Sequence, residues 1–331
     1  LLINWIYRRV LGRAYNVLAY LEWIYGHNGA ASAAYHQALN WFDYTGLEDE
    51  RADTLNNLSF LLAILGNYLQ AKQYADRSLK LRQQFGQKYP VALSHNTRGL
   101  IYALQGEFDW GERECKLASD KFAEIESQRG IGLACNALGY IFRQKGNRWR
   151  KNESTIEQTE KDFQGAQGYL HQAVDIFAVT PSSTSATVYE PIRLWEAYNE
   201  LGSLHDNWAR LYRQKSNSIQ AQAHYDSSLR YQHQALAVAQ SFGLSWQLAD
   251  TYDDLAQLYA GWGDYDKAKR QLEYALRLIT EQYDINPRHV PDDSWGEVYW
   301  LVLGKAHFQQ GVWLLEQTDR SDSSSDKSGV I

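Results

Sequence analysis

Residues 252–276, YDDLAQLYAGWGDYDKAKRQLEYAL, contain the pattern that decides the fold. On both sides of the Gly263-Asp264 pair, apolar and small residues recur at steps of three and four residues. This is the spacing of one face of an amphipathic α-helix. Ala256 and Ala268 are small enough to let two such helices approach closely. The stretch therefore predicts two helices joined by a short turn.

The same pattern recurs along the first half of the chain with a fixed period. Four asparagines stand 40 residues apart, and each is followed ten residues later by a glycine. The asparagines are Asn16, Asn56, Asn96 and Asn136, and the glycines are Gly26, Gly66, Gly106 and Gly146. A period of this length predicts a stack of similar helix pairs in which each pair packs on its neighbours.

The repeats and the breaks between them predict the domain organisation. Residues 1–317 are expected to form one array of about six helix pairs, closed by a last helix from Trp295 to about Gln317. A charged stretch at 148–162 is interpreted as an insertion inside the fourth pair. The Ser- and Asp-rich residues 318–331 are expected to be a disordered tail.

Composition limits the classes of function. The net charge of −6 does not favour nucleic-acid binding, and the chain contains no apolar run long enough to span a membrane. Two cysteines fit a reducing compartment, so we expect a cytoplasmic protein. The chain also lacks methionine, which favours a fragment of a longer protein. Phosphate-binding loops, zinc-protease motifs and Cys-x2-Cys pairs are absent from the sequence. We therefore expect no enzyme activity, no cofactor and no metal.

The repeated units resemble tetratricopeptide repeats, whose pattern is Trp-x2-Leu-Gly-x2-Tyr followed by Gly-x-Tyr and Ala. The resemblance covers roughly residues 8–316. The period of 40 exceeds the usual 34, and long repeats of this kind are similar to those of kinesin light chains and of the sensor arrays of bacterial signalling (STAND) ATPases. Residues 52–58, ADTLNNL, resemble that subgroup closely. The resemblance implies an all-α fold, a right-handed superhelical solenoid of stacked antiparallel helix pairs.

The asparagine series has two interpretations. An asparagine is unfavourable inside a helix, so its recurrence at one position needs a reason outside the helix. The amides could bond to the backbone of neighbouring repeats and set the stacking. Alternatively, they form a ladder on the concave wall, because each amide offers both donors and an acceptor to an extended peptide. The resemblance supports the ladder, since first-helix asparagines of related arrays hold the backbone of a bound peptide.

Residues four and seven positions after each asparagine share its helix face. They give the first units an aromatic, apolar wall. The later units offer the carboxylates Glu196, Asp206, Asp250 and Asp253, which would accept a basic stretch of ligand or would simply be a solvated acidic face. The predicted peptide-binding residues are Asn16, Tyr20, Trp23, Asn56, Phe60, Asn96, Leu100, Asn136, Tyr140, Arg143, Asn199, Asp206 and Asp253.

The sequence thus predicts a non-catalytic protein-interaction module that binds an extended peptide or partner segment in its concave groove. The alternative is a ligand-sensing regulatory arm cut from a larger bacterial signalling ATPase or transcription regulator. In both cases the expected partner is a protein or peptide, or upstream domains of the same chain, with no nucleic acid and no membrane.

Overall fold

The computed structural model describes residues 2–24, 27–43, 46–151, 154–178 and 190–282. Throughout these residues the chain is helical, with no β-strand. The helices are α1 (Leu2–Ile24), α2 (Asn28–Asp43), α3 (Glu48–Ile64), α4 (Tyr68–Gln84), α5 (Lys88–Leu104), α6 (Phe108–Glu124), α7 (Gln128–Gly146), the 3₁₀ helix η1 (Asn147–Lys151), α8 (Ile156–Phe177), α9 (Pro191–Gln214), α10 (Ser218–Phe242), α11 (Ser245–Trp262) and α12 (Tyr265–Gln282).

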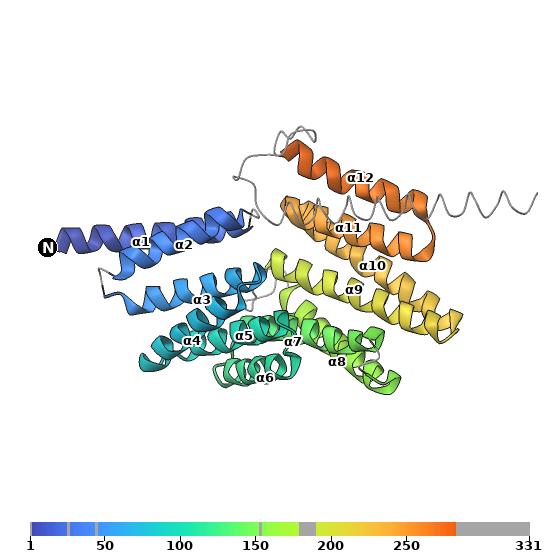
Figure 1. The fold of residues 1–331 in the computed structure, drawn as a ribbon, viewed down its shortest axis with the longest axis horizontal. Coiled ribbons are helices and arrows are strands. Elements are labelled where there is room, and N and C mark those ends of the chain that lie inside the picture. The colour runs from blue at the N-terminus through green and yellow to red at the C-terminus, as the bar shows by residue number, and fades with distance from the viewer. Residues whose placement is uncertain (1, 25–26, 44–45, 152–153, 179–189, 283–331) are drawn as a thin grey trace, which may run out of the picture.

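Consecutive helices pack as antiparallel pairs, and the pairs follow one another along a curved stack (Figure 1). The chain is therefore an all-α superhelical solenoid, as the sequence predicts. The pairs α1–α2 and α11–α12 lie at the two ends of the arc (Figure 1). The predicted closing helix and the predicted tail lie outside the described residues.

The lengths of the helices explain the 40-residue period. α3 and α4 each contain 17 residues, and each is followed by a turn of three residues. Accordingly, α3, α5 and α7 begin 40 residues apart, at Glu48, Lys88 and Gln128. A period of 34 would shorten the helices by nearly a turn each.

The turns require a left-handed residue just after the helix. Gly66 has φ of 79° and Gly106 has φ of 89°, which a glycine adopts without the steric cost of a Cβ atom. Glu126 takes the same kind of position after α6 with φ of 54°. Gly146, the last of the predicted glycine series, is instead helical. A Cβ atom there would lie 2.3 Å from Cε1 of Phe163, so this glycine serves helix packing.

The fourth and fifth pairs depart from the period. The stretch 148–162, interpreted from its sequence as an insertion, contains most of η1 and the first residues of α8, which begins at Ile156. Its last seven residues are therefore part of the second helix of the pair. α9 and α10 are longer than the helices of the other pairs, at 24 and 25 residues.

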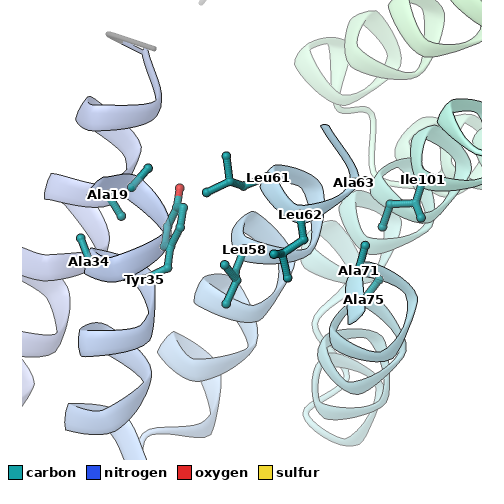
Figure 2. Close-up of a cluster of buried hydrophobic side chains, with 11 residues drawn as sticks. Ala19, Ala34, Tyr35, Leu58, Leu61, Leu62, Ala63, Ala71, Ala75 and Ile101 are labelled. Carbon is teal, nitrogen blue, oxygen red and sulfur yellow. The ribbon is translucent and has the colours of Figure 1, made fainter. Parts of the chain in front are cut away.

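The core is a series of clusters between successive helices. In one of them, Tyr35 of α2 lies with Leu58 and Leu61 of α3, and the cluster continues through Ala71 of α4 to Ile101 of α5 (Figure 2). Small residues at the crossings allow this close packing. Some residues of these clusters, such as Leu61 and Leu133, also face the inner side of the stack, where they form part of the wall of a cavity.

Candidate functional site

The inner face of the solenoid contains a cavity of about 550 Å³. Its walls come from the first helix of every pair, α1, α3, α5, α7, α9 and α11, with Tyr35 of α2 added. Nine of the predicted binding residues line it: Tyr20, Trp23, Asn56, Phe60, Asn96, Leu100, Asn136, Tyr140 and Asn199. The repeated face that the sequence singles out is therefore a cavity wall.

The other four predicted residues do not line this cavity. Asn16 is half-buried on α1, and Arg143 uses its guanidinium on Glu200, with Nε 2.7 Å from Oε2. Asp206 accepts from Nε of Arg210 at 2.8 Å, which neutralises its charge on the same helix. Asp253 is fully buried. A ligand in the cavity would not reach the carboxylates of Asp206 and Asp253.

The end of the cavity near α1 is aromatic and apolar. The ring centroids of Tyr20 and Trp23 lie 5.7 Å apart, and Trp23 meets Phe60 edge-on at 5.9 Å. Ile64 and Leu104 extend this wall. Ile64 is among the exposed large hydrophobic side chains of the chain. Aromatic rings held by their neighbours offer large contact area at low entropic cost, so this end suits an apolar side chain of a ligand.

The opposite end is lined by a second aromatic pair that sequence reasoning missed. Trp195 of α9 and Trp246 of α11 meet edge-on with centroids 5.2 Å apart. The Nε1 atom of Trp195 donates to Oγ1 of Thr251 at 2.9 Å, which fixes the ring. They lie four and seven residues before Asn199 and Asp253, outside the columns of residues that the sequence pattern singles out.

A further group of lining residues lies one helical turn before the asparagine position, and of its members the sequence analysis named only the two carboxylates. Leu93, Leu133, Glu196 and Asp250 each precede the Asn, or its equivalent, by three residues, and all four line the cavity. Residues three apart share a helix face as residues four apart do. The 40-residue spacing of Leu93 and Leu133 was therefore a usable signal, because the same face extends in both directions from the asparagine.

The asparagine amides combine both interpretations of the sequence. Asn56 and Asn96 line the cavity but are only 4% and 6% exposed. Oδ1 of Asn56 accepts from Nη1 of Arg82 at 3.2 Å, and Nδ2 of Asn136 donates to the backbone oxygen of Arg193 at 3.0 Å. These two amides thus also join neighbouring helices.

The amide oxygens of the remaining series are buried without a protein partner. Oδ1 of Asn16, Asn96, Asn136 and Asn199 has no hydrogen-bond partner among the described residues. A buried polar atom left in this state costs free energy, typically about 1–3 kcal/mol. The same unpartnered amide oxygen occurs at the same position in four repeats, so it is a property of the repeated helix face. Three of these four side chains, Asn96, Asn136 and Asn199, are in the cavity wall.

Most charged side chains of the cavity wall form ion pairs, either with one another or with charged residues just outside the wall. Arg193 donates to Glu196 at 2.6 Å, and Arg129 pairs with Glu190 and donates to the Tyr89 hydroxyl at 2.5 Å. Glu200 is held by Arg143. Because these carboxylates and guanidinium groups neutralise each other, the cavity is less acidic than the sequence alone suggests.

The described residues contain no group of three or more His, Cys, Asp or Glu side chains that could hold a metal ion. Both cysteines are buried, and burial raises the pKa of the Cys115 and Cys135 thiols, which disfavours the reactive thiolate. Within the described part of the chain, no helix is both long enough and apolar enough to cross a membrane.

Comparison with protein-family models and with curated proteins gave no match. Among solved structures, the chain is similar to BtubC (BKLC) from P. vanneervenii, with 20% identity over 81% of this chain and 96% of that one, at a TM-score of 0.48. It is also similar to a Rap protein complexed with Competence and Sporulation Factor, with 13% identity over 82% and 75% of the two chains, at a TM-score of 0.48. Likenesses at this level say nothing of this chain's partners.

Proposed function

We propose that this chain is a tetratricopeptide-type interaction module that binds an extended peptide segment of a partner protein in its inner cavity, and that it is not an enzyme. The observation that carries the proposal is the recurrence of one helix face, with asparagine at its centre, along the wall of one cavity. A repeated wall suits a ligand that is itself repetitive, and the backbone of an extended peptide is such a ligand.

The cavity favours a particular order of chemistry in the bound segment. The apolar end around Trp23 and Phe60 would hold a large apolar side chain, which usually provides most of the affinity of an interface. The asparagine amides would bond to the peptide backbone. The paired charges at Arg193 and Glu196 would contribute little net affinity, because a ligand would have to compete with an existing ion pair. The ligand-sensing role in a larger signalling protein stays a prediction from the sequence, since no described residue bears on it.

The test begins with a displayed library of random linear peptides selected on the full chain. The peptides obtained are then titrated by isothermal calorimetry against wild type and four variants. Phe60→Ala should weaken binding by about 10- to 100-fold, and Asn96→Ala by about 10-fold, as the loss of a buried anchor and of a backbone hydrogen bond would do.

Two matched controls lie outside the cavity. Trp110→Ala removes an exposed aromatic ring from α6, and Asp206→Ala removes a carboxylate that is bonded to Arg210. Neither should change the affinity by more than about two-fold. Selection that yields no peptide, or peptides sensitive to Trp110→Ala but indifferent to Phe60→Ala and Asn96→Ala, would refute the proposal.

A further inference from the structure

The first helix, α1, exposes an apolar stripe that no cavity or core uses. Its large side chains are between 43% and 62% exposed: Ile6, Tyr7, Val10, Val17, Leu18 and Leu21. Ala14, at the centre of the stripe, is also exposed. None of these residues lines the inner cavity. A surface helix normally has polar residues on its outer side, so a continuous apolar stripe marks an interaction site.

The stripe lies opposite the face by which α1 joins the solenoid. With 100° between successive residues, its members fall within an arc of about 120°. Gly12 and Ala19 lie on the other side, where Gly12 packs against the ring of Phe42 and Ala19 is buried in the first core cluster. Among the described helices, α1 packs on α2 and to a small extent on α3. It lies at one end of the arc of helices (Figure 1), and the side chains of the stripe are exposed.

The spacing of the stripe is that of a helix–helix seam. Residues 7, 10, 14, 17 and 21 alternate steps of three and four, and are Tyr, Val, Ala, Val and Leu. This is the heptad pattern of residues that interdigitate with a second helix. A continuous seam of two heptads predicts that another α-helix lies along α1.

We propose that the occupant is α1 of a second copy of this chain, in antiparallel orientation, so that the array forms a symmetric dimer. The seam has nearly the same spacing in both directions from Ala14, with Tyr7 and Leu21 each seven residues away. A two-fold axis at Ala14 would therefore place Tyr7 of each copy near Leu21 of the other, with the small side chain at the closest approach. Self-complementarity of this kind is what a two-fold interface needs.

The area and the charges support the same occupant. The exposed part of the six large side chains amounts to roughly 600 Å² per copy, near the 800 Å² that a stable interface buries on each partner. Arg8, Arg9 and Arg13 all lie in the first half of α1, whereas Glu22 lies in the second half. A parallel pair would place the arginines of both copies side by side, whereas an antiparallel pair separates them.

A lipid surface fits the stripe less well. Interfacial helices use unpaired basic side chains beside the apolar face to bind anionic lipid. Here Arg9 and Arg13 both donate to Oε1 of Glu50 on α3, at 3.0 and 2.7 Å. Their charge is therefore partly neutralised within the protein.

The experiment measures the molar mass of the full chain in solution, by light scattering after size-exclusion chromatography and by analytical ultracentrifugation. The protein concentration is varied over roughly 1–100 µM, the range in which dimers of common affinity form. Wild type should have twice the monomer mass of 38.1 kDa. Val10→Glu and Val17→Glu place a carboxylate in the seam and should return the mass to that of the monomer. The control Ile219→Glu, at an exposed apolar residue of α10, should remain dimeric. Circular dichroism shows that each variant is folded.

Two cysteine variants test the orientation of the helices in the dimer. Ala14→Cys should give a disulfide-linked dimer under mild oxidation, because only Ala14 meets its own copy in the antiparallel pair, whereas Tyr7→Cys should not. A monomeric wild type at the highest concentration, a dimer unaffected by Val10→Glu and Val17→Glu, or crosslinking at Tyr7→Cys would overturn the proposal. So would binding to phosphatidylserine vesicles that Val17→Glu abolishes while wild type stays monomeric.

Discussion

Arg82 is 1% exposed, and removing its side chain should strongly destabilise the junction between α3, α4 and α5. Its Nη1 atom donates to Oδ1 of Asn56 at 3.2 Å, to the backbone oxygen of Pro90 at 2.9 Å and to Oγ of Ser94 at 2.7 Å. Its Nη2 atom donates to Oδ1 of Asp53 at 2.6 Å. One buried guanidinium group thus joins the α3–α4 pair to α5 of the next pair, and it also holds the amide of the cavity residue Asn56.

The cost of Arg82→Ala follows from what it leaves behind. Asp53 is half-exposed, so water replaces that ion pair and little is lost there. The oxygens of Asn56, Pro90 and Ser94 would lose a charged donor at a site closed to bulk water, and a void would form beside them. Together these losses amount to about 3–5 kcal/mol.

The neighbouring repeat explains why an arginine stands there. Phe122 occupies the position 40 residues later, and its ring fills the space that a Cβ atom at Gly130 would take, with Cδ1 only 2.1 Å from that point. The residue equivalent to Gly130 is Pro90, whose ring would obstruct a phenyl group at position 82. Arg82→Phe should therefore also be destabilising, and the double variant Arg82→Phe/Pro90→Gly should recover at least half of the loss.

The assay is thermal and urea unfolding followed by circular dichroism, with hydrogen exchange to locate the effect. Arg82→Ala should lower Tm by several degrees and speed exchange in α3–α5 more than in α9–α11, because stability in a repeat array is set by neighbouring units. Arg77→Ala, an exposed arginine on the same helix, is the control and should change stability by less than about 0.5 kcal/mol. An Arg82→Ala variant as stable as this control would refute the reasoning.

Two further predictions concern strain and protonation. Glu126→Gly relieves a left-handed backbone at φ of 54° and should raise stability by about 1 kcal/mol in urea unfolding; an unchanged midpoint would contradict this. Burial, with the neighbouring His224 next in effect, lowers the pKa of His205 to about 3. Because the folded state disfavours the protonated ring, this histidine should weaken the fold as the pH falls from about 6.5 toward 3. His205→Phe should remove much of that acid sensitivity, whereas the same change at exposed His233 should leave it intact.

The fold was predictable because the repeat is regular. The 40-residue period, the turn glycines and the small residues at helix crossings are properties of short stretches, and Gly66 and Gly106 indeed adopt left-handed turns. Gly146 shows the limit of that reasoning. Its role depends on Phe163 of the following helix, a contact that spacing within one repeat does not reveal.

The cavity was predictable where the repeat is strict and less so where it is expanded. In the first four units the residues one turn after the asparagine line the cavity, and so do the asparagines themselves except Asn16. Trp195 and Trp246 also line it, but they lie outside the columns that the repeat pattern singles out. The partners of the carboxylates were also hidden, because the pairing of Arg143 with Glu200 joins residues 57 positions apart. Ion pairs between residues far apart in the sequence determine how acidic a groove is. They form only when the repeats stack, so the sequence pattern within one repeat does not reveal them.

The central claim is that a peptide occupies the inner cavity, and photo-crosslinking tests it most directly. Benzoylphenylalanine is placed either at Leu100, in the cavity wall, or at Leu117, an exposed apolar residue of α6. Each protein is irradiated with a selected peptide, and the crosslinked product is located by mass spectrometry. The account predicts a peptide adduct from position 100 that excess unlabelled peptide suppresses, and none from position 117. An adduct from position 117 with none from position 100 would contradict it.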